Sequence, residues 1–527
     1  MVSIIELKTF KKSFWKNLVT RKSLSEDNIC FGGENAELDN RVYDSNDNQY
    51  SEKIKLLRDR IKSFQPVHVE ISISRYNFFK LHLIAQCYLN YFEDSKTKLP
   101  EITFSPYPLS DIMNSFNKYI KMLVSFLPKH FTLELYDSKL EAMLLEFQRL
   151  AVKNDIDEDN LIRLLGVICE HAFIGPQQIV IDPHHRCNAN CSHCWVHTPN
   201  VTHTKEFLNM TFPMERYKEI IDDASELKVG TIVLQGDGEP LLHPDSLEML
   251  RYARAKGLGV KFFTNGILLG EKAASTVVEI GVNEIYCSVP AGTPETYHLI
   301  NSKQPPDTYN EVVNNIRRLM RIKKESGKTN PYVIATHVIH TQNYHELVKI
   351  AQDDVYEDVD AARFYLIRLD VMNSFLQLQP NEIDKIKKQI PIVKKILKKG
   401  NVTFIDNIKF QLANYCNRDG SWSKNIFLQQ GCIVGWYYNL IPAKGDISFC
   451  CHLRTVGDLT KERFKDIWTS PRYEKWRIQG KHFKKNKNAM FLNNQPLFDE
   501  HCTHCDNHQI ILEVYSDLER FNLKKYY

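Results

Sequence analysis

Hydrophobic and polar positions alternate between a strand-like and a helix-like pattern from about residue 176 to residue 369. Short runs rich in β-branched and aromatic residues are typical of buried strands, and the chain has six of them: QIVIDP, GTIVLQG, GVKFFTN, NEIYCSV, YVIATHVI and ARFYLIRL. The stretches between these runs place apolar residues three or four positions apart, which predicts amphipathic helices. Because strands and helices alternate, we predict a parallel sheet with right-handed crossovers. Six such units predict an α/β fold with a partial, TIM-like (β/α)6 barrel over residues 173–400.

Residues 1–172 show a different pattern, from which we predict a mainly helical N-terminal extension of unknown role. The first 50 or so residues are polar and rich in Asn and Asp, which is typical of a loop or a partly disordered segment. Helical periodicity then recurs over four stretches, residues 51–64, 75–92, 109–127 and 138–154.

The composition is that of an ordinary globular protein, with 527 residues of which 43% are apolar and 25% are charged. A net charge of +4 is too small to favour a nucleic-acid partner. No apolar run approaches the ~20 residues that span a bilayer, so we expect no membrane partner. The N-terminus lacks the apolar core of a signal peptide, and the thirteen cysteines cluster at metal-ligand spacings. We therefore predict a cytoplasmic protein.

Three of these cysteines, Cys187, Cys191 and Cys194, lie within eight residues in the stretch IDPHHRCNANCSHCW. A cubane 4Fe–4S cluster normally takes four thiolates, so a C-x3-C-x2-C triplet would leave one iron open to a substrate or cofactor. The triplet follows the first predicted strand, and parallel barrels place their working sites at the carboxyl ends of the strands. The alternative is a zinc site in which a neighbouring histidine supplies the fourth ligand, either His184, His185 or His193.

A second element, Gly236-Asp237-Gly238-Glu239-Pro240, follows the second predicted strand. Glycines let a backbone approach a ligand closely, and a carboxylate can accept hydrogen bonds from an ammonium group. In isolation the same five residues could form a simple turn. Together, the triplet and this element resemble the radical S-adenosylmethionine (SAM) superfamily, in which the triplet is the hallmark and a GGE element recognises the amino group of SAM. Asp237 stands where a second glycine is common, whereas Gly238 and Glu239 match.

The resemblance implies ligands for two cofactors. The cysteine triplet would hold a SAM-binding 4Fe–4S cluster, and the second element would bind SAM through Gly238 and Glu239. Asn265, after the third predicted strand, and Ser288, after the fourth, resemble positions near the SAM ribose and carboxylate.

Residues 401–527 carry another group of cysteines, in which Cys432 and Cys450 are followed by Cys502 and Cys505. Their pattern, C-x12-G-x4-C and later C-x2-C, resembles the twitch domain or the shortened SPASM domain that follows many radical SAM barrels. Four thiolates saturate one cubane cluster, so the resemblance implies a single auxiliary 4Fe–4S cluster with no open iron. A four-cysteine zinc site is the alternative that the spacing permits.

Two further cysteines accompany this group. Cys416 precedes it in the stretch NYCNRDG, and Cys451 directly follows a predicted cluster ligand. Some related peptide epimerases use a cysteine thiol as a hydrogen donor. Cys416 and Cys451 are therefore the candidate catalytic residues.

The resemblance implies an oxidoreductase or maturase that cleaves SAM reductively to a 5′-deoxyadenosyl radical, which abstracts a hydrogen atom from a substrate. The electron would come from a donor such as flavodoxin or ferredoxin. The C-terminal module favours a ribosomally made peptide as substrate, although no small peptide-recognition domain is apparent in residues 1–172. One alternative is a small molecule such as an amino sugar, oxidised or dehydrated; another is a non-enzymatic metal-cluster scaffold.

Overall fold

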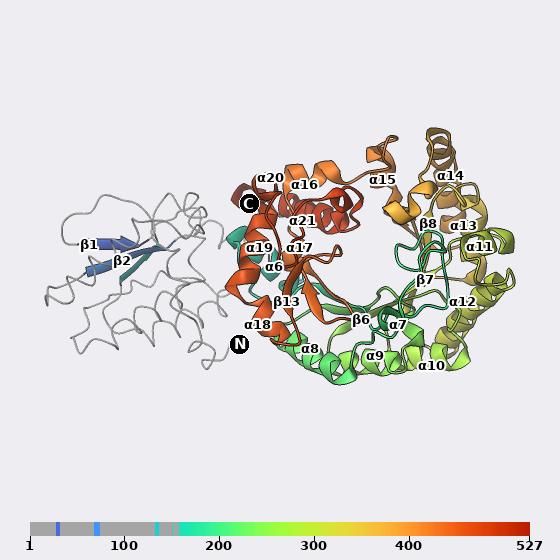
Figure 1. Ribbon diagram of the computed structural model, residues 1–527, viewed down its shortest axis with the longest axis horizontal. Helices are drawn as coiled ribbons and strands as arrows, with labels where there is room; N and C mark the ends of the chain where they lie inside the picture. Colours follow the sequence, from blue (N-terminus) through green and yellow to red (C-terminus); the bar gives the residue numbers. More distant parts are fainter. Residues whose placement is uncertain (1–27, 32–67, 74–131, 136–149, 151–156) are drawn as a thin grey trace. The chain divides into compact units, whose positions relative to one another are not determined.

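The computed structural model describes residues 28–31, 68–73, 132–135, 150 and 157–527 (Figure 1). The chain divides into two compact units, one formed by residues 1–171 with 515–527 and the other by residues 172–514. None of the described helices has the length and apolar composition of a membrane span.

The described part of the first unit contains a small parallel sheet, helix α6 (Glu158–Cys169), the end of α21 (His508–Arg520) and the short η8 (Lys524–Tyr526). The sheet has the order β1 (Asn28–Phe31), β2 (His68–Ile73), β3 (Thr132–Leu135). Helix α6 begins after Asp157, whose carboxylate accepts a hydrogen bond from the N–H of Asn160 at 3.0 Å. The hydrophobic pattern did not predict these strands, and the predicted helical stretches between residues 51 and 154 lie almost entirely outside the described residues.

The second unit is built on one sheet, in which the barrel strands are parallel and neighbour one another in chain order. These strands are β4 (Gln178–Ile181), β5 (Thr231–Leu234), β6 (Gly259–Thr264), β7 (Glu284–Ser288), β8 (Tyr332–Ile339), β9 (Ala361–Leu366) and β10 (Thr403–Asp406). Strands β4 to β9 confirm the six strands predicted from the sequence. Strand β10 pairs in parallel with β9 and adds a strand that the pattern did not predict.

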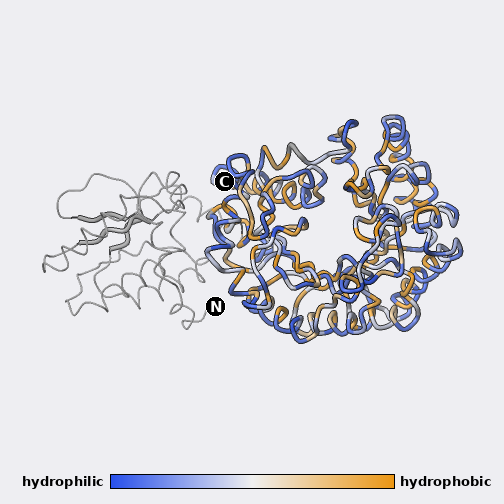
Figure 2. Tube along the Cα trace, in the orientation of Figure 1, coloured by the Kyte–Doolittle hydropathy of each residue, from blue (hydrophilic) through white to orange (hydrophobic). Residues whose placement is uncertain are grey.

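Long helices form a layer along the outer face of this curved sheet (Figure 1). They are α8 (Met214–Glu226), α9 (Ser246–Ala255), α10 (Glu271–Ile280), α12 (Thr308–Glu325), α13 (Leu347–Glu357) and α14 (Pro380–Lys399). Their polar faces make the outer edge of the layer mainly hydrophilic (Figure 2). Helix α10 ends at Gly281, whose φ of 72° suits glycine at a helix terminus.

Four shorter helical segments follow the carboxyl ends of barrel strands, where the predicted site residues lie. These segments are α7 (Lys205–Leu208) after β4, η5 (Pro240–Leu242) after β5, α11 (Pro294–Ile300) after β7 and η6 (Val371–Leu376) after β9. The loops that carry them are free to hold polar side chains because the strands themselves fill the core.

The C-terminal residues continue the barrel sheet. Strand β11 (Tyr438–Ile441) pairs in parallel with β4, so that Ile441 lies opposite Ile181. Strands β12 (Asp446–Ser448) and β13 (Thr455–Asp458) follow as antiparallel neighbours, which extends the sheet to ten strands. Around them lie α15 (Ile408–Asn414), α16 (Lys424–Gln430), α17 (Val434–Tyr437), α18 (Phe464–Trp468), α19 (Pro471–Lys481), α20 (Phe483–Asn486), η7 (Glu500–His504) and the start of α21 (His508–Arg520).

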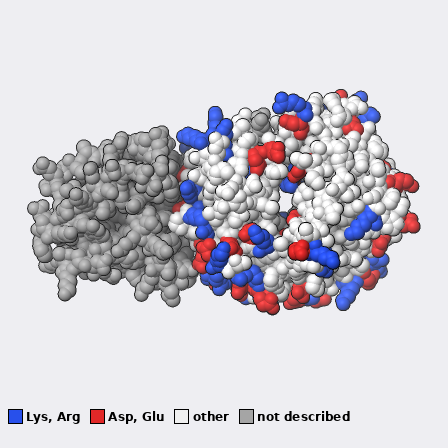
Figure 3. Space-filling model, viewed as in Figure 1, with Lys and Arg blue, Asp and Glu red and all other residues white. Residues whose placement is uncertain are grey.

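Charged side chains of both signs are interspersed on the visible face of the second unit (Figure 3). This mixture agrees with the small net charge of +4. Because charges of both signs are mixed on this face, surface charge indicates no site there, and the candidate sites are the loops that carry the cysteines.

Candidate functional site

The loop after β4 carries the three cysteines predicted to hold the SAM-binding cluster. The N–H of Ala189 points at the Sγ of Cys187 at 3.4 Å. The N–H groups of Val196 and His197 donate to the Sγ of Cys194 at 3.3 and 3.2 Å. Hydrogen bonds from backbone N–H groups favour the thiolate form, which is the form that binds a metal.

Burial makes these thiolates costly without a metal. It raises the pKa of the Cys187 thiol to about 11, and it also raises the pKa of Cys191 and Cys194. The three sulfurs repel one another when charged, so a cationic metal centre among them would remove both penalties. The donor set therefore fits an iron–sulfur cluster held by three cysteines.

Other loops at the same edge of the sheet fix the shape of the cysteine loop. Ser192 donates through its N–H to the carbonyl of Ile300 at 2.8 Å and through its hydroxyl to Gln342 at 2.6 Å. Asn373 of η6 donates to the carbonyl of His193 at 3.2 Å. Segments that follow β7, β8 and β9 thus hold the loop in place before any cofactor binds.

The Gly236–Pro240 element after β5 is joined directly to the cysteine loop. The N–H of Glu239 donates to the carbonyl of Arg186 at 2.8 Å, and the Nε2 of His184 lies 2.8 Å from the carbonyl of Glu239. A Cβ added to Gly238 would lie 2.4 Å from two backbone oxygens, those of His184 and Arg186. Glycine is therefore required at position 238 because the two loops touch there through their backbones.

We expect Gly238→Ala to displace the cysteine loop, because the two carbonyls that its methyl group would meet belong to backbone. Reconstituted protein should then lose about four irons per chain, the content of one cubane cluster. Iron analysis measures this, with Gly270→Ala as the matched control, because a Cβ at Gly270 meets nothing within 4 Å. Normal iron content in the Gly238→Ala protein would contradict the close approach of the two loops.

Two histidines beside the triplet, His184 and His185, already have other partners, which counts against the zinc alternative. His184 uses its second nitrogen, Nδ1, to accept the N–H of Arg186 at 3.2 Å. His185 pairs with the buried carboxylate of Asp182 at 3.1 Å, and this partner raises the pKa of His185 although burial alone would lower it. Two of the three histidines that could have completed a zinc site with the triplet are therefore engaged, which favours the cluster.

Asp237 stands where a GGE element would have a second glycine, but the structure gives it a local partner. Its carboxylate lies 3.7 Å from the Nε2 of His185 and is about one third exposed. A Cβ at Gly236 would lie 1.9 Å from Asp182, so this first glycine also serves close packing. Asp237, in place of a glycine, thus adds a second carboxylate beside the Asp182–His185 pair. The backbone of Gly238 and Glu239 still contacts the cysteine loop.

Glu239 is buried, with 3% of its surface exposed, yet its carboxylate is only partly satisfied. Oε1 accepts from the N–H of Leu241 at 3.1 Å and from the hydroxyl of Thr264 at 2.7 Å. Oε2 accepts from the N–H of Asn265 at 2.7 Å. A carboxylate offers about four acceptor positions, so one remains on Oε2. Burial without a cation raises the pKa of Glu239 to about 7, and a bound ammonium group would reverse that effect.

The other two predicted SAM residues lie at the same edge of the sheet. Asn265 follows β6, and its Nδ2 donates to the side chain of Asn188 in the cysteine loop at 2.7 Å. Ser288 is the last residue of β7, opposite Thr336 of β8. The structure therefore brings Asn265 to Glu239 and to the cysteine loop, whereas no hydrogen bond among the described residues links Ser288 to them.

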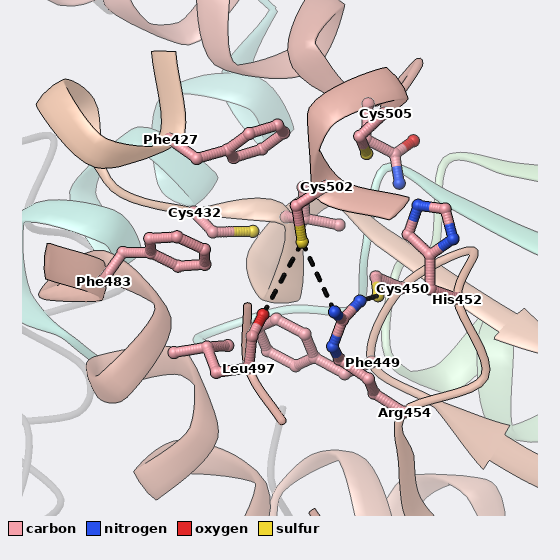
Figure 4. A pocket seen from close by; sticks show the side chains of 12 residues that line it. Phe427, Cys432, Phe449, Cys450, His452, Arg454, Phe483, Leu497, Cys502 and Cys505 are labelled. Atoms are coloured by element: carbon pink, nitrogen blue, oxygen red, sulfur yellow. Dashed lines mark hydrogen bonds between the residues drawn. The ribbon is translucent and has the colours of Figure 1, made fainter. Parts of the chain in front are cut away.

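A second cysteine site lies in the C-terminal module. Its four predicted ligands come from separate segments, and all of them line one pocket (Figure 4): Cys432 after α16, Cys450 after β12, Cys502 in η7 and Cys505 directly after η7. Each is between 5% and 8% exposed. Apolar side chains form much of the walls, namely Phe427, Val434, Phe449, Phe483 and Leu497, and the polar side chains of His452, Arg454 and Asn507 line the rest. Four buried thiolates in one pocket fit a closed cluster.

Hydrogen bonds hold the segments of this pocket together. The hydroxyl of Ser423 donates to the carbonyl of Cys502 at 2.8 Å and accepts the N–H of Cys505 at 2.9 Å. The N–H of Cys432 donates to the carbonyl of Gly480 at 2.7 Å. The ligand segments are thus fixed by contacts that do not involve the sulfurs.

The structure separates the two candidate catalytic cysteines. Cys451 lies beside the pocket, where its sulfur, the sulfur of Cys505 and a ring nitrogen of His452 lie within 4.8 Å of one another. Cys416 lies in the turn between α15 and α16, where its N–H donates to the carbonyl of Ser421 at 2.8 Å, and it does not line the pocket. Proximity to the second cysteine site therefore favours Cys451.

Two arginines at these sites escaped sequence reasoning. Arg454 hydrogen-bonds to two sulfurs of the C-terminal pocket. The guanidinium of Arg368 stacks over the ring of Trp195 at 4.0 Å, and its buried Nε has no hydrogen-bond partner among the described residues. A single arginine in a loop carries no motif, so only its position beside Cys450 and Cys451 in the stretch CCHLR hinted at a role for Arg454.

Comparison with protein families gives two matches that coincide with these two sites. Residues 181–353 match the radical SAM superfamily. Residues 432–506 match the SPASM family of iron–sulfur cluster-binding domains. The first match begins at the end of β4 and includes the cysteine triplet, and the second begins at Cys432 and ends just after Cys505.

Individual relatives are distant. A tungsten-containing aldehyde ferredoxin oxidoreductase cofactor-modifying protein of Pyrococcus furiosus is 24% identical over 316 residues, which cover 56% of this chain and 82% of that protein. The mycofactocin maturase MftC of Mycobacterium ulcerans is 27% identical over 130 residues, covering 24% and 32%. Among solved structures, Streptococcus suis SuiB bound to SAM matches with a TM-score of 0.48 and 14% identity over 74% of this chain and 84% of that one.

Proposed function

The protein is a radical SAM enzyme with an auxiliary iron–sulfur domain, and on that premise we propose that it modifies a ribosomally made peptide. Its two domains bind a SAM-associated 4Fe–4S cluster and an auxiliary cluster. When bound, the first cluster and SAM supply a 5′-deoxyadenosyl radical by one-electron reductive cleavage. A low-potential donor such as flavodoxin or ferredoxin provides the electron.

The observation that supports this function is the junction between the cysteine loop after β4 and the Gly236–Pro240 loop after β5. Cys187, Cys191 and Cys194 would hold the cluster, while the contact between Arg186 and Glu239 keeps the SAM-binding element beside them. The free acceptor position on the Glu239 carboxylate suits the SAM ammonium group. This chain's contribution is to hold SAM and the substrate carbon in one orientation and to exclude water.

Arg368 offers a cation near the two cysteine sites. Arg368 follows β9, and its guanidinium acts electrostatically on both Cys194 and Cys451. It therefore lies near a cysteine of each site, stacked on the partly exposed Trp195. A guanidinium can bind a carboxylate through two parallel hydrogen bonds, so Arg368 would orient an acidic group of the peptide.

Two relatives point to different substrates. Mycofactocin maturase supports a peptide substrate, whereas the cofactor-modifying protein of Pyrococcus furiosus favours the alternative, a small molecule. Anaerobic assays with reduced holoenzyme and SAM would decide between them. Synthetic peptides encoded by short reading frames next to the gene should raise the rate of 5′-deoxyadenosine formation and change in mass by a whole number of hydrogens. Stimulation only by a metabolite fraction below about 1 kDa would overturn the peptide proposal.

A matched pair of variants tests the role of Glu239. Glu239→Gln would remove a charge-assisted contact worth roughly 1.5–3 kcal/mol to the SAM ammonium group. The Kd for SAM should then rise about ten- to a hundred-fold, as measured by equilibrium binding to the holoenzyme. Glu248→Gln, at an exposed carboxylate that pairs with Arg251, is the control and should bind SAM normally. Unchanged affinity in Glu239→Gln, with iron content intact, would show that the element is only a turn.

A further inference from the structure

Arg454 lines the C-terminal cysteine pocket and contacts two of its sulfurs. Its Nη1 lies 3.2 Å from the Sγ of Cys450, and its Nη2 lies 3.4 Å from the Sγ of Cys502. The residue is only 1% exposed. Figure 4 shows its guanidinium between these two sulfurs, at one side of the pocket. A buried cation therefore bridges two of the four predicted ligands of the auxiliary cluster.

The orientation of Arg454 is set by groups other than the sulfurs. Its Nε donates to the carbonyl of Pro496 at 2.6 Å, and its Nη2 is paired with Asp499 at 2.9 Å. Its carbonyl accepts the N–H of Phe449 at 2.8 Å, which closes the loop between β12 and β13. Leu453 begins the return of this loop with a φ of 52°. These contacts aim the remaining N–H groups at the cysteines whether or not a cluster is bound.

Such a cation acts on the energy of the two redox states of a cluster. A cubane cluster on four thiolates is negatively charged and gains one further negative charge when it is reduced. Hydrogen bonds to the sulfurs, local charge and solvent exposure set the potential of that reduction. The surrounding Phe427, Phe449 and Phe483 exclude water, so the charge of Arg454 is weakly screened at the sulfurs. Asp499, which pairs with the same Nη2 that faces Cys502 but does not line the pocket, offsets part of this charge.

We propose that Arg454 raises the reduction potential of the auxiliary cluster so that this cluster can accept an electron from the substrate. The step balances as follows: one substrate hydrogen atom goes to the 5′-deoxyadenosyl radical and forms 5′-deoxyadenosine, leaving a substrate radical. That radical then loses one proton to solvent and one electron to the oxidised auxiliary cluster. The substrate is thereby oxidised by two electrons overall, which corresponds to dehydrogenation or crosslinking and not to epimerisation. The oxidation of a substrate rests on the proposed function, whereas the effect of Arg454 on the reduction potential of the auxiliary cluster does not.

The potential can be measured without any substrate. Replacing Cys187, Cys191 and Cys194 with alanine leaves the auxiliary cluster as the sole paramagnetic centre after reduction. Potentiometric titration followed by electron paramagnetic resonance then gives its potential in three backgrounds: the parent, Arg454→Met and Arg454→Lys. Methionine removes the charge and both N–H donors, and lysine keeps the charge but loses the two-pronged geometry. We expect the potential to become more negative in Arg454→Met and to change less in Arg454→Lys.

The matched control is Arg472→Met in the same module, because Arg472 pairs with Glu462 at 2.9 Å near the surface and does not line the pocket. The auxiliary cluster of Arg472→Met should have the same reduction potential as the auxiliary cluster of the parent. An unchanged potential in Arg454→Met, with four irons retained, would overturn the proposal. Loss of the cluster from both Arg454 variants would also overturn it, since Arg454 would then serve assembly. If no peptide proves to be a substrate, the shift in potential is still expected, so the two proposals fail separately.

Discussion

Replacing Cys187, Cys191 and Cys194 together with alanine should lower the iron content of reconstituted protein from about eight to about four per chain and abolish SAM cleavage. The structure supports this because the three sulfurs share one loop, and backbone N–H groups already point at two of them. His184 and His185, which precede the triplet, have other partners and are therefore not available to replace a lost thiolate.

Iron and sulfide analysis, together with chromatographic detection of 5′-deoxyadenosine, would measure the effect of the triple variant. Cys287→Ala is the matched control, because Cys287 is buried in β7 and belongs to neither cysteine site. It should keep about eight irons. Zinc in place of iron, or an unchanged iron count in the triple variant, would refute the assignment of the triplet.

Removing the auxiliary cluster should separate two reactions that normally occur together. In Cys502→Ala, SAM cleavage should continue without substrate turnover, because the electron for cleavage is needed only at the triplet cluster. Product formation should fall below detection, because the substrate radical would have lost its electron acceptor. Mass spectrometry of the peptide and quantification of 5′-deoxyadenosine in one assay give both values.

The folding of the variant must be checked first, since a closed cluster also holds loops together. Thr503→Ala is the matched control within η7: it loses a hydroxyl that donates to the carbonyl of Glu500 at 2.6 Å, but it keeps every thiolate. Circular dichroism should give the same helix content for both variants and the parent. A correctly folded Cys502→Ala protein that still makes full product would show that the second cluster is structural.

The barrel could be predicted from the sequence because each of its strands and helices has a recognisable pattern within a short stretch of residues. Strands β4, β5 and β8 are almost continuous runs of buried residues, whereas β6, β7 and β9 alternate buried and partly buried positions. The helices between them, such as α12, keep one apolar stripe. The cysteine triplet and the Gly238–Glu239 element were found for the same reason, since each is contiguous and follows a strand. Their placement at neighbouring strand ends then follows from the parallel topology.

What escaped prediction depends on contacts between distant residues. The pairing of β11 with β4 joins segments about 260 residues apart through backbone hydrogen bonds, which leave no pattern in the side chains. The guanidinium of Arg454 is oriented by the carbonyl of Pro496 and the carboxylate of Asp499, about 40 residues further along the chain. Short strands such as β1 and β3, of four residues each, carry too few positions for any periodicity to be recognised.

The shared sheet also limits how this protein can be divided. Without β11, β4 would become an edge strand with a row of unpaired backbone N–H and C=O groups along residues 178–181. Such an open edge invites pairing with other chains and aggregation. The C-terminal module is thus a cap for the barrel as well as a cluster carrier, and the two should melt in one cooperative transition. A barrel separated from this module would therefore need another strand in the place of β11 to stay monomeric.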